Sequence, residues 1–155
     1  MWLLFPVVAV ALVVWYALNP SPLQVRTEDG EVSVPAGTAV FVGVAALDPG
    51  RDLLLRDVEV DGATTGTEVE LLMCRDGRIS TTTSAEAFCG LVLPVSEESL
   101  TMGSADQLIL RVASEDARTV APGPVRVAFR EGLQWGEQEI DPRFEITFLD
   151  RGAQS

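Results

Sequence analysis

The sequence predicts an antiparallel β-sandwich of about seven to nine strands, immunoglobulin-like in architecture and preceded by one N-terminal transmembrane helix. Three observations carry this prediction. No charged side chain occurs from Trp2 to Leu18, short apolar runs then alternate with turn clusters, and the clearest of those runs repeat with a period of two residues. A small β-barrel is the alternative architecture.

The apolar segment Trp2–Leu18 is predicted to be an uncleaved membrane anchor. At about 1.5 Å rise per residue its helix would measure roughly 25 Å, near the lower limit for crossing a hydrocarbon core of about 30 Å. Trp2 and the pair Trp15 and Tyr16 stand at its two ends, as interfacial aromatic residues do. The two prolines of Asn19-Pro20-Ser21-Pro22 then end the helix, because the residue before a proline disfavours helical geometry.

Two other interpretations of this segment remain open. A cleaved signal peptide needs basic residues at its start and small residues just before the cleavage site. Here only Met1 precedes the apolar run, and the candidate cleavage sites place Trp15, Tyr16 or Asn19 where small residues are needed. A buried apolar helix of a soluble protein is the second alternative. The charges near Arg26 specify the orientation only weakly. We expect the N-terminus inside and the domain outside, mainly because of the cysteine pair described below.

Composition bounds the rest of the chain. About 130 residues follow the anchor, which suits one domain. We divide the chain into an anchor at 1–19, a short linker at 20–23, a domain at 24–150 and a tail at 151–155. The net charge of −12 repels nucleic acid and anionic lipid headgroups, so we expect no nucleic-acid partner.

The residue types also exclude several chemistries. The chain has no His and no Lys, and all eleven basic residues are Arg. The commonest general base and the commonest transition-metal ligand are therefore missing, together with Schiff-base chemistry. We expect neither an enzyme nor a bound cofactor.

The only two cysteines, Cys74 and Cys89, are predicted to form a disulfide in an extracytoplasmic domain. A loop of about 15 residues would contribute about 3 kcal/mol in the chain-entropy model. The alternative is two unpaired buried cysteines in a cytoplasmic domain. The bridge would close only the excursion 78–88 with no Trp inside it, so the likeness to immunoglobulin domains is one of architecture alone.

Nine segments are predicted as strands because β-branched and apolar residues alternate there and turn residues bound them. They are Leu23–Thr27, Val32–Pro35, Ala39–Ala46, Leu53–Val60, Glu68–Cys74, Phe88–Val95, Gln107–Ala113, Val125–Arg130 and Phe144–Leu149. Ser80–Ala87 and Ser96–Met102 are each predicted to form a turn of helix. Gly132–Pro142 is predicted to be a connection between the last two strands.

Two candidate sites follow from this organisation. Trp135, with Gln134 and Glu137 beside it, is a candidate recognition anchor, because Trp is enriched at interface hot spots; packing on the sheet edge is the alternative. Asp48 and Asp52 could supply oxygen ligands to a cation such as Ca²⁺, although their spacing is not that of an EF-hand and a solvated acidic face is the alternative.

These observations favour a single-pass plasma-membrane protein whose β-sandwich acts outside the cytoplasm as an accessory or interaction module. Its expected partners are the lipid bilayer, through Trp2–Leu18, and a membrane or envelope protein. A domain that binds a small ligand or Ca²⁺ at the cell surface is the alternative function.

Overall fold

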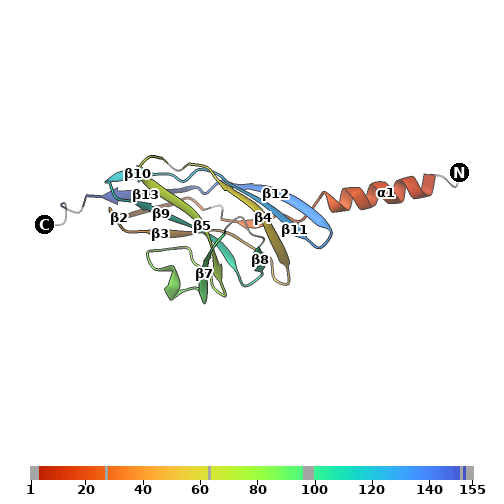
Figure 1. Cartoon of the computed structure of the whole chain (residues 1–155), viewed down its shortest axis with the longest axis horizontal. Coiled ribbons are helices and arrows are strands. Elements are labelled where there is room, and N and C mark those ends of the chain that lie inside the picture. The colour runs from red at the N-terminus through yellow and green to blue at the C-terminus, as the bar shows by residue number, and fades with distance from the viewer. Residues whose placement is uncertain (1–3, 27, 63, 96–99, 151, 153–155) are drawn as a thin grey trace.

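Antiparallel β-strands gathered in three sheets make up most of the chain, and one helix projects from one end of them (Figure 1). The computed structural model describes residues 4–26, 28–62, 64–95, 100–150 and 152. The predicted tail 151–155 lies outside the described residues apart from Gly152, and Trp2 lies outside them as well.

The helix α1 runs from Leu4 to Ala17 and has 14 residues. At about 1.5 Å rise per residue it measures roughly 21 Å, against a hydrocarbon core of about 30 Å. In the part of the chain that the structure describes, no helix is both long enough and apolar enough to cross a membrane. This finding corrects the predicted transmembrane helix over Trp2–Leu18.

The largest sheet has six strands. Its order is β1 (Gln24–Val25), β3 (Val40–Ala46), β9 (Gln107–Ser114), β5 (Thr67–Arg75) and β7 (Leu91–Pro94), and β6 (Thr81–Thr82) pairs with β3. β3 is buried at every residue, because both faces of this part of the sheet are covered. Its near-continuous apolar sequence follows from that double burial.

The other two sheets are smaller. A four-stranded sheet has the order β12 (Gln134–Ile140), β11 (Val125–Glu131), β4 (Asp52–Val60) and β8 (Leu100–Gly103). A three-stranded sheet has the order β10 (Arg118–Val120), β13 (Phe144–Leu149) and β2 (Gly30–Pro35). β13 and β2 pair in parallel, whereas the other described pairs are antiparallel.

The predicted strands are confirmed with small shifts of their ends, and the described residues contain four more, β6, β8, β10 and β12. The helical turn predicted over Ser96–Met102 is wrong where it can be compared, because Leu100–Gly103 is strand β8; residues 96–99 lie outside the described residues. Ser80–Ala87 contains strand β6 and a 3₁₀ helix at Ala85–Ala87. The predicted connection Gly132–Pro142 is largely strand β12.

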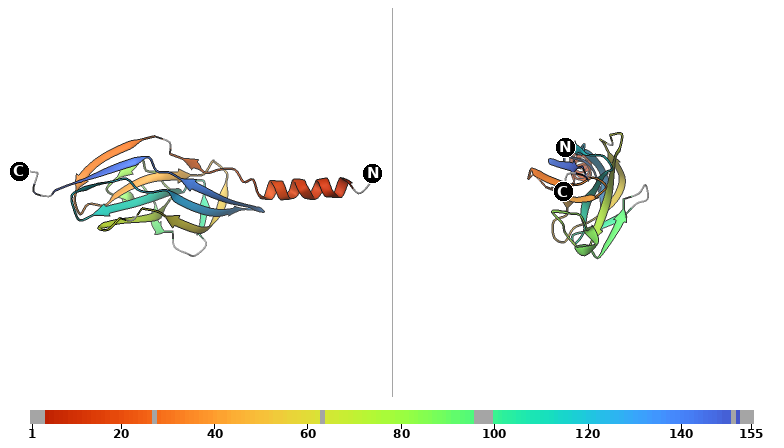
Figure 2. Two further views of the ribbon diagram at one scale, coloured as in Figure 1. Left: turned by 90° about the horizontal axis from the view of Figure 1, so that it is seen from above. Right: turned by 90° about the vertical axis from the view of Figure 1, so that its left-hand side faces the viewer.

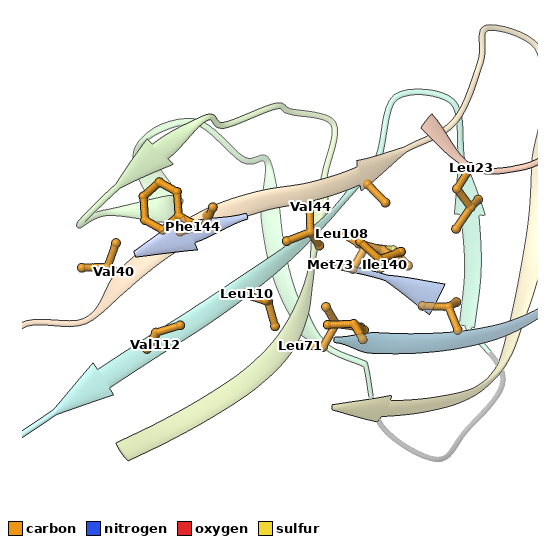
Figure 3. Packing of buried hydrophobic residues seen from close by; sticks show 14 of the residues in the cluster. Leu23, Val40, Val44, Leu71, Met73, Leu108, Leu110, Val112, Ile140 and Phe144 are labelled. Atoms are coloured by element: carbon orange, nitrogen blue, oxygen red, sulfur yellow. The ribbon is translucent and has the colours of Figure 1, made fainter. Parts of the chain in front are cut away.

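Residues from all three sheets fill one apolar core (Figure 3). Leu71 and Leu108 come from the six-stranded sheet, Ile140 from the four-stranded sheet and Phe144 from the three-stranded one. Leu23, the last residue of the linker, is buried in the same core. Each fully buried side chain of this kind contributes about 1.5–3 kcal/mol, so the core holds the sheets and the start of the domain together.

Candidate functional site

The surface of α1 is apolar on every side and lies open. The large apolar side chains from Val7 to Leu18 have exposed fractions between 50% and 66%. These residues are Val7, Val8, Val10, Leu12, Val13, Val14, Trp15, Tyr16 and Leu18. The helix has no acidic residue in its first turn and no basic residue in its last. A helix that is hydrophobic all round requires an apolar environment, and the described part of the β domain does not supply one.

The segment after α1 is fastened to strand β12. Gln134 Nε2 donates hydrogen bonds to the carbonyl oxygens of Tyr16, at 3.0 Å, and Asn19, at 3.3 Å. Leu23 N donates to Gln138 Oε1 at 2.7 Å, and Gln138 Nε2 returns a 3.4 Å bond to Leu23 O. Because Gln134 and Gln138 are four residues apart on a strand, their side chains leave the same face of β12.

Gly136 lies between these two glutamines and permits the close approach. A Cβ atom built at Gly136 would lie 2.5 Å from Pro20 Cγ and 2.8 Å from Phe129 Cζ. Both contacts are shorter than van der Waals separation, so a larger residue would push the linker away. Gln134, Gly136 and Gln138 therefore form one continuous face that receives residues 16–23.

Arg51 completes the fastening from the other side. Its Nη2 donates to Ser21 O at 2.8 Å and its Nη1 to Pro22 O at 2.9 Å. The same guanidinium pairs with both oxygens of Glu131 on β11, at 3.0 and 2.6 Å, and approaches Asp48 Oδ2 at 3.4 Å. These contacts engage the full fork of donors that a guanidinium presents.

The Arg51–Glu131 pair is electrostatically strong because it is largely shielded from solvent. The side chains are 13% and 22% exposed. Hydrogen bonds from Arg51 hold the pKa of the Glu131 carboxyl below its ordinary value, although partial burial opposes them. Hydrogen bonding to Glu131 in turn raises the pKa of the Arg51 guanidinium. Glu131 therefore stays ionised and Arg51 stays protonated across the physiological pH range.

The opposite face of β12 presents Trp135. Its ring is 48% exposed and lies with its centroid 5.2 Å from the guanidinium carbon of Arg56 and 5.2 Å from that of Arg130. Arg130 is the cross-strand partner of Trp135 on β11. Arg56 reaches the ring from β4 because a bulge makes it an extra residue there: Ala128 pairs with Asp57, and the next residue on β11 pairs with Leu55.

Neither of these two arginines forms an ion pair with a carboxylate among the described residues. Arg130 Nε donates to Gly132 O at 2.8 Å, inside the β11–β12 turn. Both guanidinium groups therefore contact the Trp135 ring through cation–π interactions. Leu133, in the same turn, is 75% exposed.

Glu137 lies farther along the outer face of β12, beside a line of charges. Arg126 pairs there with Glu59 at 2.8 Å and with Glu139 at 3.7 Å. A shallow hollow on this face is lined by Asp57, Glu59, Arg126, Ala128 and Glu137. Four of these five residues are charged, and three of the four are acidic, so this part of the sheet presents a negative surface to solvent.

The candidate cation ligands do not lie in a cluster of acids. The Asp48 carboxylate accepts hydrogen bonds from Arg51 and from Gln24 Nε2. Asp52 is an exposed residue at the start of β4, paired with Gly103 of β8. No group of three or more acidic or cysteine side chains gathers to hold a metal ion within the part of the chain that the structure describes.

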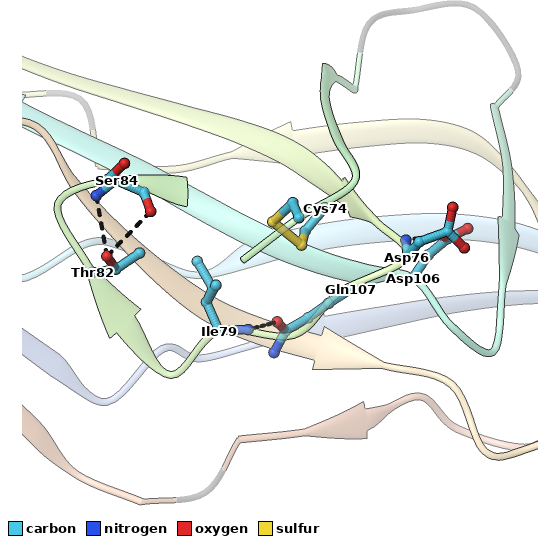
Figure 4. Close-up of a disulfide and its surroundings, with 8 residues drawn as sticks. Cys74, Asp76, Ile79, Thr82, Ser84, Asp106 and Gln107 are labelled. Atoms are coloured by element: carbon cyan, nitrogen blue, oxygen red, sulfur yellow. Dashed lines mark hydrogen bonds between the residues drawn. A yellow bond between two sulfur atoms is a disulfide. The ribbon is translucent and has the colours of Figure 1, made fainter. Parts of the chain in front are cut away.

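The predicted disulfide is confirmed (Figure 4). Cys74 on β5 and Cys89 are joined with a Cα–Cα distance of 5.2 Å. The bridge closes the excursion that contains β6 and the 3₁₀ helix. Ile79 N, in this excursion, donates to Gln107 Oε1 on β9 at 2.7 Å. Beside it the buried carboxylate of Asp106 accepts from Arg75 Nη1 at 2.9 Å and from Asp76 N at 3.2 Å. A disulfide of this kind indicates an oxidising compartment.

Another hollow, of about 310 Å³, lies away from the helix. It is lined by residues from the β2–β3 turn, the start of β5 and the end of β9, including Thr67, Glu68 and Arg111. Glu68 Oε2 accepts a 3.1 Å hydrogen bond from Arg111 Nη1, and Thr67 is buried. This hollow is therefore lined by groups that already bind one another.

Sequence reasoning identified Trp135 and Gln134 but not the residues around them. Arg51 stands in a Pro-Gly-Arg turn and gives no signal of its role. Gln138 and Gly136 could have been found, because Gln134, Gly136 and Gln138 alternate in sequence with Trp135, Glu137 and Glu139, which is the period of a strand. Arg56 could not, since only a bulge brings it to Trp135.

The chain matches no protein-family model, no curated protein and no solved structure. Fold and site therefore define its class directly. It is a mostly β domain of antiparallel sheets with one disulfide, to which an exposed apolar helix is fastened at one end.

Proposed function

We propose that this protein is an extracytoplasmic β-sandwich, anchored to a lipid bilayer by α1, that acts as an accessory or interaction module rather than as an enzyme. The observation that carries the proposal is the ring of exposed apolar side chains around α1. Lipid is the environment that matches such a surface on all sides, because a packed partner helix covers only one stripe.

The disulfide supports a position of the domain on the outer side of the membrane. Cys74 and Cys89 are joined in the folded domain, and disulfides persist in secreted, periplasmic and surface proteins. The buried core drawn from three sheets supports a sandwich of packed layers. The domain is thus placed, in this proposal, on the oxidising side of the bilayer.

The fastened linker supports presentation at a fixed position. Arg51, Gln134 and Gln138 hold the main chain of residues 16–23, so the domain cannot swing freely on a flexible tether. A domain held close to the bilayer suits contact with a neighbouring membrane or envelope protein. The acidic outer face around Glu137 and Glu59 would receive a basic segment of that neighbour.

Cell fractionation tests the anchoring. The full chain with a C-terminal epitope tag is expressed, and membranes are washed with alkaline carbonate. We expect the tag in the washed membranes and open to protease added to spheroplasts. The matched variant Val10→Arg with Val13→Arg should release the chain, since both side chains lie exposed on α1. Recovery of the unmodified chain in the carbonate wash, or a tag that resists protease, would contradict the proposal.

Crosslinking in living cells tests the interaction. The unmodified chain should give a crosslinked adduct with one membrane or envelope protein, identified by mass spectrometry after purification in mild detergent. The charge-reversed variant Glu59→Arg with Glu137→Arg should lose that adduct. Reversal of Glu145, an exposed residue of β13, serves as the matched control and should keep it. Equal adducts from both variants would exclude the acidic face as the contact.

A further inference from the structure

Exposed apolar and cationic side chains gather at the β11–β12 turn and on the strand ends beside it. Anchoring by α1 does not require this group of side chains. Leu133 is the most exposed large apolar side chain among the described residues, at 75%, and Trp135 is 48% exposed. Arg56 and Arg130 lie against the Trp135 ring, both without a carboxylate partner in the described chain. We call these four residues the hairpin tip.

The hairpin tip lies at the end of the domain from which α1 leaves. Gln134, between Leu133 and Trp135, donates its side-chain hydrogen bond to Tyr16 O, near the end of the helix. Figures 1 and 2 show the β11–β12 hairpin reaching the base of α1 in views turned by 90° from each other. A bilayer that receives α1 would therefore meet the hairpin tip next.

The chemistry of the hairpin tip matches the interfacial region of a phospholipid bilayer. Trp is enriched there because its ring is apolar and its N–H is polar, and Trp15 and Tyr16 on α1 stand at the same end. Guanidinium groups bind phosphate through two parallel hydrogen bonds. Among the described residues, five arginines form no ion pair with a carboxylate, and Arg56 and Arg130 are the two of them that flank Trp135. Lipid phosphates would be the complement of these two guanidinium groups.

We propose that the hairpin tip, Leu133 and Trp135 with Arg56 and Arg130, inserts into the phosphate and upper acyl-chain region of the bilayer that holds α1. This inference rests on the proposed anchoring. A helix alone leaves the domain free to rotate about the helix axis and to tilt. A second contact removes that freedom and fixes the direction in which the acidic outer face of the four-stranded sheet points.

Depth-dependent fluorescence quenching tests the inference on the full chain. The chain has three tryptophans, so Trp2→Phe with Trp15→Phe leaves Trp135 as the only emitter. This chain is reconstituted into phosphatidylcholine vesicles whose acyl chains carry bromine either near the headgroup or near the methyl end. Insertion of about 5–10 Å predicts strong loss of Trp135 emission with the shallow bromines and little with the deep ones.

Matched variants separate lipid contact from other causes. Leu133→Asp, and separately Arg56→Gln with Arg130→Gln, should remove most of the quenching while the vesicles still float with the protein. Leu149→Asp, at an exposed position on β13, should leave the quenching unchanged. Floating vesicles with unquenched Trp135 would overturn this inference and leave the anchoring intact, whereas protein that does not float would overturn both. The emission of Trp135 is also measured in detergent without vesicles. If it changes with protein concentration there, the hairpin tip contacts a second copy of the chain, and the inference is overturned.

Discussion

Arg51 and Glu131 meet as a two-point ion pair, with Nε 3.0 Å from Oε1 and Nη2 2.6 Å from Oε2. The same guanidinium donates to the carbonyl oxygens of Ser21 and Pro22. One side chain therefore joins β11 to the segment that leads from α1 into the domain. This junction and the hydrogen bonds from Gln134 and Gln138 of β12 together position the helix relative to the sheets.

Arg51→Lys should loosen the junction. An ammonium group cannot form the two-point pair and reach both carbonyl oxygens at once, so we expect a loss of about 1–3 kcal/mol in the free energy of unfolding. Denaturant unfolding of the full chain in mild detergent measures it. Arg126→Lys is the matched control: its pair with Glu59 is solvent-exposed, and its effect should stay within about 0.5 kcal/mol. Equal effects of the two substitutions would contradict the assigned role of Arg51.

Acid should weaken the same junction. The pKa of Glu131 lies below its ordinary value of 4.5 in the folded protein, because of hydrogen bonds from Arg51. A depressed carboxyl pKa contributes stability that is present above the ordinary value and lost as the pH falls through the folded value. Unfolding of the native chain and of Glu131→Gln should therefore differ at about pH 7 and converge towards about pH 3. A constant difference across that range would show that Glu131 stays uncoupled from folding.

Gly136→Ala should displace the linker from β12. The added methyl group would lie 2.5 Å from Pro20 Cγ and 2.8 Å from Phe129 Cζ, and overpacking of this kind costs about 1–3 kcal/mol. A spin label on α1 and another on β13 should give a broader distance distribution than in the native chain. Among the described residues, the methyl group of Gly152→Ala would contact Asp150 Oδ1 at an ordinary 3.9 Å, so this control should change neither stability nor the distances. Unchanged distances in Gly136→Ala would refute the tight contact.

Removal of the disulfide should cost stability without unfolding the sheets. Its 15-residue separation gives about 3 kcal/mol in the chain-entropy model. Cys74→Ala with Cys89→Ala should lower the free energy of unfolding by that amount, and the denaturant midpoint should fall accordingly. Reductant should have the same effect on the native chain. Reductant should not affect the double variant. A midpoint that reductant leaves unchanged in the native chain would mean that the bridge stabilises nothing.

The strands that alternate apolar and polar residues were predictable from the sequence. Val125, Val127 and Phe129 are all buried, as are Phe144 and its partners on β13, because one face of each strand meets the core. The disulfide was predictable as well, since only two cysteines were available. The local pattern of residues is enough to predict a strand wherever the buried face of that strand is apolar.

Strand β12 and the site built on it were not predictable in the same way. On the inward face of β12, Gln134 and Gln138 bind main-chain groups of residues 16–23 through hydrogen bonds, Gly136 makes room for Pro20, and Ile140 enters the apolar core. Arg51 lies 80 residues from Glu131, and no local pattern encodes such a distant pair. The meeting of Arg56 with Trp135 depends on a bulge, which is a property of strand pairing.

Flotation of the reconstituted full chain tests the central claim most directly. Purified protein is mixed with phosphatidylcholine in detergent, the detergent is dialysed away, and the mixture is centrifuged through a density gradient. Embedding of α1 predicts that the native chain rises with the vesicles and that Val10→Arg with Val13→Arg stays at the bottom. The native chain remaining at the bottom as an assembly of defined size would show that the apolar surface of α1 is covered by other copies of the chain, and would contradict the account.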